Sequence, residues 1–234
     1  MGERRRLPFV EVSRRPVLLL DLDGVVVHEC GRDGAGDREI LILHRDLKAS
    51  LANAVRHTFV VTHRSRREAT RICEVAGLEA GGSMSLIAAE DLLREACARL
   101  RVRELARFGL RKTFALSIAE RLAGAGPDDL VVVDDRQQNL DPLLAAGIGL
   151  AMKAPPVGWL DRGTLLTFDL AEALESLPAW YGGRASRRQI DLPPIDRALE
   201  PWQQSGRSTV SLNNHLFNRA RRIARGLRTG RPNR

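Results

Sequence analysis

Four continuous apolar runs lie along the chain, and segments with helical patterns separate them. The first begins at Val17 and reaches a turn at Gly24, and the others cover 58–62, 130–134 and the end of 145–152. Short continuous apolar runs are typical of strands that are buried on both faces of a parallel sheet. We therefore expect four parallel strands.

The segments between these runs carry helical periodicity or helix boundary signals. Ser65, followed three residues later by Glu68, has the pattern of a capping box, and Gly77 is a helix stop. The expected helices cover 46–56, 65–76, 84–107 and 112–122. Alternating strands and helices predict an α/β fold: a Rossmann-like parallel sheet flanked by helices, with right-handed crossovers and ligands at the carboxyl ends of the strands.

The chain divides into a leader, one catalytic domain and an extension. Residues 1–15 form a basic N-terminal leader, 16–178 the catalytic domain, and 179–234 an Arg-rich extension that Pro and Gly residues interrupt. Within the extension, 213–228 has the pattern of an amphipathic helix. Apolar stretches on either side of the Gly-rich residues 31–37 predict a small hairpin or flap.

The composition is that of a soluble globular protein, because 44% of the 234 residues are hydrophobic and 28% are charged. No apolar run approaches the roughly 20 residues that a membrane-spanning helix needs. The basic N-terminus is not followed by the apolar core of a secretory signal. We therefore expect a cytoplasmic protein without a transmembrane segment.

Positive charge is concentrated near the C-terminus. Residues 181–234 contain 12 arginines and 3 acidic residues, a net +9, whereas the whole chain carries +8. The basic helix expected at 213–228 could dock on its own domain, or it could bind nucleic acid, an anionic membrane surface or an acidic partner.

Polar residues stand at the ends of the predicted strands and at the start of one predicted helix. In chain order they are Asp21 with Asp23, Thr62, Lys112, and Asp134 with Asp135. The lysine is notable because only three of the 37 basic residues are lysines, and only lysine offers a compact, mobile ammonium group.

These residue types suit the transfer of a phosphoryl group. An aspartate such as Asp21 is ionised at neutral pH and can attack phosphorus without a neighbouring base. Asp23 could protonate the leaving oxygen and later deprotonate a water molecule. Thr62 and Lys112 would hold the oxygens of the phosphate. A phosphate dianion among several carboxylates needs a further cation, which favours a hard, oxygen-liganded metal such as Mg2+.

The segments VLLLDLDG, FVVTHRS, RK and VVVDDRQQN resemble, in this order, the four motifs of the haloacid dehalogenase-like (HAD) superfamily. The resemblance covers roughly residues 16–152. It implies an aspartyl-phosphate intermediate on Asp21, with Asp23 as general acid and base. It also implies Mg2+ held by the Asp21 side chain, the Asp23 backbone carbonyl and an acid of the pair Asp134 and Asp135.

Within that pair, we favour Asp135 as the direct metal ligand and Asp134 as the group that holds Lys112, because a related family form has glycine at the first position. Asn139 stands where that form often has a further acid, so its role stays open. His63 and Arg64 follow Thr62 and could face the substrate, but a solvated loop is the favoured interpretation, so they are left outside the core site.

The spacing of the motifs limits the size of any cap over the site. The 38 residues between Asp23 and Thr62 exclude a large cap domain, and the 49 between Thr62 and Lys112 leave room for one short helical element. Whether 84–107 forms a cap stays open. A minimally capped phosphatase with an open site is expected, and such members of the superfamily favour bulky or macromolecular phosphoesters or are capped by another subunit.

Two other functions fit the same sequence. A phosphotransferase would use the same intermediate on Asp21 and pass the phosphoryl group to an acceptor other than water. Alternatively, the catalytic core is vestigial or secondary, and the protein acts by binding nucleic acid or an acidic partner through its tail. The sequence identifies neither the substrate nor the oligomeric state.

Overall fold

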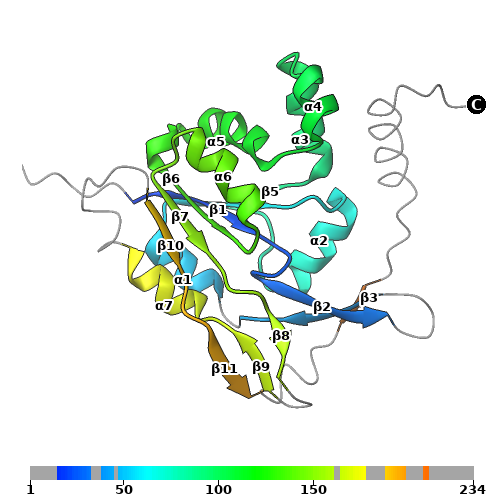
Figure 1. Ribbon diagram of the computed structural model, residues 1–234, viewed down its shortest axis with the longest axis vertical. Helices are drawn as coiled ribbons and strands as arrows, with labels where there is room; N and C mark the ends of the chain where they lie inside the picture. The colour runs from blue at the N-terminus through cyan, green and yellow to red at the C-terminus, as the bar shows by residue number, and fades with distance from the viewer. Residues whose placement is uncertain are drawn as a thin grey trace, which may run out of the picture.

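The computed structural model describes residues 15–32, 38–44, 47–160, 164–177, 188–198 and 208–210. Residues 1–14 of the expected leader (1–15) and the whole of the expected helix at 213–228 lie outside these residues. In the described part of the chain, helices cover both faces of a central sheet, and two small sheets lie beside it (Figure 1).

The central sheet has six strands in the order β10-β7-β6-β1-β4-β5, and every neighbouring pair is parallel. Its strands are β1 (Val17–Asp21), β4 (His57–Val61), β5 (Met84–Ile87), β6 (Leu130–Asp134), β7 (Leu150–Lys153) and β10 (Arg188–Asp191). The four strands expected from the apolar runs are all present. The predicted Rossmann-like α/β fold is confirmed.

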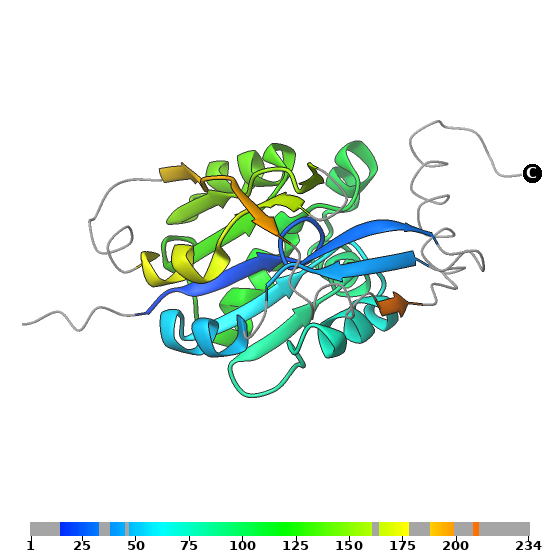
Figure 2. The same ribbon diagram turned by 90° about the horizontal axis from the view of Figure 1, so that it is seen from below.

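Helices pack on both faces of this sheet: Figure 1 shows α5 and α6 on one side of it and α1 and α7 on the other, and Figure 2 looks onto the side that carries α1 and α7. One layer contains α1 (Leu47–Ala54), α2 (Arg66–Val75) and α7 (Leu170–Glu175), and the other contains α3 (Ala89–Ala98), α5 (Ala115–Ala123) and α6 (Gln137–Ala145). Alternate residues of β1 face opposite layers: Leu18 and Leu20 belong to the first core, Val17 and Leu19 to the second. Burial on both faces explains why β1 is apolar at every position before Asp21.

Two small sheets complete the described structure. The strands β2 (Val27–Arg32), β3 (Arg38–Ile42) and β12 (Ser208–Val210) form one antiparallel sheet, in which β2 and β3 are the expected hairpin. The other contains β8 (Gly158–Trp159), β9 (Thr164–Thr167) and β11 (Ile195–Ala198). The remaining helical elements are α4 (Val102–Phe108) and the short turns η1 (Lys112–Phe114) and η2 (Pro127–Asp129). Among the described residues, the segment between Asp23 and Thr62 carries this hairpin and α1, and the segment between Thr62 and Lys112 carries α2, β5, α3 and α4. Neither described segment contains a separate cap domain.

The capping signal before α2 has the predicted geometry. The Ser65 side chain accepts a hydrogen bond from the backbone N–H of Glu68 at 3.4 Å, so Ser65 is the N-cap. At the other end, α2 ends at Val75 with Ala76 as its C-cap, and Gly77 follows with a φ of +69°, which favours glycine. The predicted helix of 65–76 is thus confirmed within one residue at each end.

The expectation of one helical segment over 84–107 is wrong at its start and in its middle. Residues 84–87 form β5, which pairs in parallel with β4 and buries Met84 and Ile87. Helix α3 begins only at Ala89, and Leu100, with a φ of +53°, separates it from α4. Pairing with the sheet edge decides the conformation of this short apolar segment, and periodicity alone does not reveal that pairing.

Part of the expected C-terminal extension contributes strands to these sheets. Strand β10 extends the central sheet beyond β7, and β11 pairs with β9. Leu192, which follows β10, is buried in the same core as α1 and α7. The described helices include none with the length and apolar character required to cross a membrane.

Candidate active site

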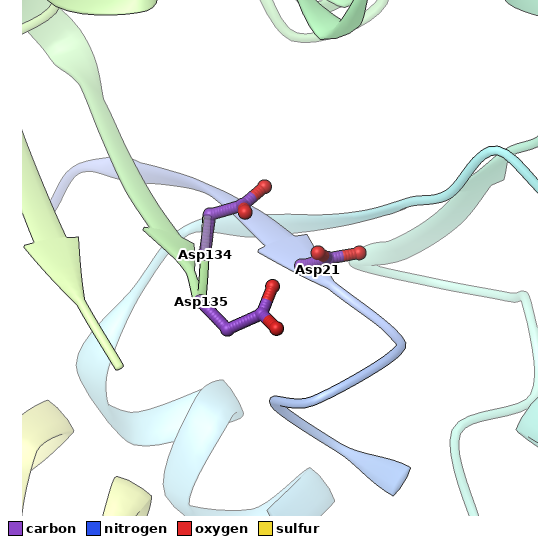
Figure 3. A group of neighbouring side chains, drawn as sticks. All are labelled: Asp21, Asp134 and Asp135. Carbon is purple, nitrogen blue, oxygen red and sulfur yellow. The ribbon is translucent and has the colours of Figure 1, made fainter. Parts of the chain in front are cut away.

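The parallel sheet brings the predicted polar residues to one edge. Leu20 of β1 is in register with both Val60 of β4 and Val133 of β6. The next residue along in β1 and β6 is an aspartate, Asp21 and Asp134 respectively. Figure 3 shows Asp134 and Asp135 at the end of β6, beside Asp21 at the end of β1. The carboxyl ends of these strands therefore form the floor of the site.

Three carboxylates lie close together at this edge. Asp21, Asp134 and Asp135 each offer an oxygen atom, and these atoms all lie within 4.8 Å of one another. Asp21 and Asp134 are buried, with 6% and 0% of their surface exposed. Such a concentration of negative charge, taken out of water, needs cations to be stable.

Lys112 supplies one of these cations. It opens η1, and its Nζ lies 2.6 Å from Asp21 Oδ1 and 2.6 Å from Asp134 Oδ2. Burial alone lowers the pKa of Lys112, but the two aspartates outweigh burial, so the pKa is raised and the ammonium group stays charged.

The pKa of Asp21 is raised well above its usual range. Burial is the largest cause; Lys112 opposes it, and the like charges of Asp134 and Asp23 add to it. One ammonium group therefore does not neutralise the carboxylates around Asp21. A bound divalent cation would lower the pKa of Asp21 and favour its ionised form.

Asp134 and Asp135 differ in their hydrogen bonds. Asp134 accepts bonds from Lys112, from the backbone N–H of Arg136 at 2.9 Å, and from the Asn139 amide at 2.9 and 3.0 Å. Its oxygens are thus engaged by protein donors, and Asn139 helps to orient them.

By contrast, Asp135 Oδ1 is buried without a hydrogen-bond partner among the described residues. A contact of 3.8 Å to Arg136 Nε brings positive charge near it. Burial, and secondarily the charge of Asp134, raise the pKa of Asp135. A buried carboxylate oxygen that lacks a donor is suited to bind a cation.

These residues fit a hard divalent cation. The donor set consists of carboxylate oxygens, which Mg2+ prefers, and the unpartnered Asp135 oxygen supplies a ligand that no protein group among the described residues occupies. The sequence-based expectation named Asp21, Asp23, Asp134 and Asp135 for this role. Three of these four contribute side chains to the carboxylate cluster.

Gly24 explains the close approach of the turn to β6. Its φ is +77°, and a Cβ atom at this position would lie 2.5 Å from Asp135 Oδ2. Any larger residue would therefore collide with Asp135 as well as strain the backbone.

Thr62 follows β4 and is fully buried. Its Oγ1 accepts a hydrogen bond from the backbone N–H of Arg64 at 3.1 Å, and its own N–H donates to Ile87 O at 3.0 Å. The hydrogen of the hydroxyl is not used in either bond, so the hydroxyl can still donate to an incoming oxygen atom.

Asp23 contacts Arg64, which was not expected to belong to the site. Arg64 Nε lies 2.9 Å from both carboxylate oxygens of Asp23, and Arg64 Nη2 also bonds Asp23 Oδ1. Burial alone lowers the pKa of Arg64, but hydrogen bonds and charge from Asp23 and Glu68 outweigh it and raise the pKa. The residue is a buried cation and not part of a solvated loop.

His63 also lies beside the site. Its Nε2 is buried without a hydrogen-bond partner among the described residues. Burial, and next the charge of Lys112, lower the pKa of His63 to about 4, so the ring is neutral at physiological pH. No sequence pattern distinguishes this histidine from an ordinary loop residue.

No protein-family model and no curated protein matches this chain. Among solved structures, a hypothetical protein from Xanthomonas campestris is 20% identical, with a TM-score of 0.44, over 74% of this chain and 85% of that one. A protein from Streptomyces avermitilis described as a HAD family hydrolase is 16% identical, with a TM-score of 0.40, over 60% of this chain and 72% of that one. A protein from Vibrio cholerae, described as a 3-deoxy-D-manno-octulosonate 8-phosphate phosphatase, is 15% identical, with a TM-score of 0.37, over 61% of this chain and 68% of that one.

Matches at such low identity and TM-score carry no argument about activity or substrate. The order of the motif residues and their meeting at one sheet edge are properties of this chain itself. On that basis, the chain resembles a HAD-type hydrolase.

Proposed function

We propose that this protein is a Mg2+-dependent phosphatase that hydrolyses phosphomonoesters through an aspartyl-phosphate on Asp21. The observation that carries the proposal is the buried group in which Lys112 bridges Asp21 and Asp134 while Asp135 keeps an oxygen without a donor among the described residues. A structural ion pair would need only one carboxylate for one lysine. A cluster with excess negative charge at the end of a parallel sheet is typical of a cation and phosphate site.

In the first step, an oxygen of Asp21 attacks phosphorus and the ester bond breaks. Asp23 gives its proton to the leaving oxygen, so that the alcohol departs neutral. The Thr62 hydroxyl donates a hydrogen bond to an equatorial oxygen, and Lys112 stabilises the negative charge on the phosphoryl oxygens. When bound, Mg2+ would neutralise the charge of the carboxylates and the phosphate. The Asp21 and Asp135 side chains and the Asp23 backbone carbonyl would hold it, while Asp134 would hold Lys112 beside them.

In the second step, Asp23 takes a proton from water as the water oxygen attacks phosphorus. The bond between phosphorus and Asp21 then breaks, inorganic phosphate leaves, and both aspartates return to their starting states. If an alcohol takes the place of water, the same site transfers the phosphoryl group. Product analysis in the presence of added alcohols separates a phosphatase from a phosphotransferase.

The test is phosphate release from a panel of nucleotides, sugar phosphates, phosphopeptides, nucleic-acid ends and an aryl phosphate. We expect Mg2+-dependent release that Asp21→Asn reduces by at least about a thousandfold, because the nucleophile is lost. Asp141→Asn, an exposed change on α6, is the control and should leave the rate unchanged. Phosphate release that survives Asp21→Asn, or none from any substrate with Mg2+, would contradict the proposal.

The access to the site suggests a class of substrate. Because the described segments between the motif residues contain no separate cap domain, we propose that a bulky or macromolecular phosphoester can reach Asp21. The Arg-rich residues 211–234 lie outside the described structure, and we propose that they bind nucleic acid or an acidic partner.

A further inference from the structure

Among the described residues, a single side chain, that of Arg64, holds the carboxylate of Asp23. Arg64 Nε lies 2.9 Å from each of its oxygens, and Arg64 Nη2 contacts Oδ1. Among the described residues, no other side chain donates to this carboxylate, although 33% of the Asp23 side chain is exposed. Asp23 stands on a turn, and without Arg64 its side chain could adopt other staggered rotamers.

Arg64 is itself fixed from three sides. Its Nη1 pairs with Glu68, a buried residue of α2, and its Nη2 lies 3.3 Å from Glu29 Oε2 on β2. Its backbone N–H donates to Thr62 Oγ1. A planar guanidinium group bound to several carboxylates has little freedom to rotate, because each rotation would break charge-assisted hydrogen bonds.

These contacts connect four parts of the molecule: the catalytic turn, the end of β4, α2 and the β2–β3 hairpin. Asp23 and Arg64 are 41 residues apart in the chain, so the contact exists only in the folded protein. A general acid must lie within hydrogen-bond reach of the leaving oxygen, and an error of about 1 Å in its position can cost about a hundredfold in rate.

We propose that Arg64 is a positioning residue that fixes the Asp23 carboxylate for proton transfer to the leaving group. The proposal rests on the proposed phosphatase function and adds a role for Arg64 to it. Arg64 is not itself a catalytic residue, because it acts through Asp23.

The experiment compares two substrates that differ in their need for a general acid. An aryl phosphate with a nitro-substituted ring leaves as a stable phenolate, whereas an alkyl phosphate leaves as a strongly basic alkoxide that must be protonated. The measured quantity is kcat/KM, which reports the reaction up to transfer of the phosphoryl group to Asp21. The readout is the ratio of kcat/KM between the substrates, which does not depend on how much of a variant is folded.

For Arg64→Gln, we expect kcat/KM to fall about 30-fold or more with the alkyl phosphate and less than about threefold with the aryl phosphate. Arg64→Lys keeps a positive charge beside the buried Glu68, so this variant should fold even if Arg64→Gln does not. Its single ammonium group cannot hold both oxygens of Asp23. We therefore expect the same selective loss at reduced size. Arg67→Gln, an exposed change one turn away on α2, should alter neither value.

A double-mutant cycle gives a second readout. In an Asp23→Asn background there is no acid left to position, so Arg64→Gln should cause no further loss with the alkyl phosphate. Equal losses on both substrates, or additive losses in the cycle, would overturn the role of Arg64 while leaving the phosphatase intact. If the unmodified protein releases no phosphate, or if Asp21→Asn keeps its activity, the proposed function and this inference fail together.

Discussion

At the scale of single residues, Lys112 bears most directly on stability, because it is buried between two acids. Its ammonium group lies at 2.6 Å from both Asp21 and Asp134. Removing one member of a buried ionic group leaves uncompensated charge, which typically destabilises a protein by about 3–5 kcal/mol. The same positive charge would also be missing beside the transferred phosphoryl group.

We therefore expect Lys112→Met to lower the free energy of unfolding in Mg2+-free buffer by about 3 kcal/mol and to abolish phosphate release. Lys48→Met is the matched control, because the Lys48 side chain is 60% exposed and its pair with Glu79, at 3.7 Å, is a surface ion pair. Denaturant unfolding measures the first effect and phosphate release the second. Equal stability of the two variants would refute the charge-balancing role of Lys112.

The sequence could place the polar residues at one edge but could not assign their contacts. Asp21, Thr62 and Asp134 lie at the ends of parallel strands, and parallel strands share an edge, so their proximity follows from local patterns. The side-chain directions of Arg64 and Asn139 depend on tertiary packing. An arginine after a strand is exposed by default, and only the folded chain brings Arg64 to Asp23.

At the scale of elements, the turn after β1 depends on Gly24 for two separate reasons. Its φ of +77° is a left-handed conformation, and a Cβ would lie 2.5 Å from Asp135 Oδ2. Gly124, which ends α5, has a φ of +56°, but a Cβ there would have no atom of the described residues within 4 Å. Comparing the two positions separates the backbone effect from the collision with Asp135.

Both Gly24→Ala and Gly124→Ala should lower the free energy of unfolding by about 1 kcal/mol through backbone strain. Only Gly24→Ala should also displace Asp135, weaken Mg2+ activation and reduce phosphate release. The measurement is the Mg2+ concentration that gives half-maximal activity for each variant. If Gly24→Ala keeps normal Mg2+ activation, the contact with Asp135 is not required.

Two strands escaped detection in the sequence, and for different reasons. Met84–Ile87 is apolar and precedes α3 directly, so its pattern merges with that of the helix, and only pairing with β4 makes it a strand. Arg188–Asp191 is largely polar and stands near Gly and Pro residues, which favour a linker. It becomes β10 because its backbone completes the edge beside β7.

At the scale of the whole molecule, stability should depend on pH through His44. This histidine is buried just after the β2–β3 hairpin, with its ring 5.0 Å from that of Phe168, which follows β9. The pKa of His44 is lowered to about 4, mainly by burial and further by the positive charge of Arg197. In the unfolded chain, the pKa of a histidine side chain is about 6.5.

Between pH 6.5 and 4 the unfolded chain therefore binds a proton that folded His44 does not bind. The free energy of unfolding should be highest above about pH 6.5 and should fall by up to about 3 kcal/mol as the pH is lowered to about 4, from this group alone. The measurement is the free energy of unfolding in urea between about pH 7.5 and 4.5, for the unmodified protein and for His44→Gln. Other groups, including His63, contribute to both proteins, so only the difference between the two profiles reports on His44.

We expect that difference to shrink as the pH falls, because the variant has no imidazole to protonate in its unfolded state. Parallel profiles for the two proteins would show that His44 titrates normally in the folded state. That result would mean that the region around Phe168 and Arg197 is open to water.

The position of β10 bears on how the protein folds as it is synthesised. Strand β7 ends at Lys153, but its outer neighbour in the sheet is complete only at Asp191. A nascent chain that has emerged as far as β7 has an unpaired parallel edge, and such edges invite pairing with other chains. Translation must proceed well beyond β7 before that edge closes, so slow elongation in this interval would favour aggregation over native folding.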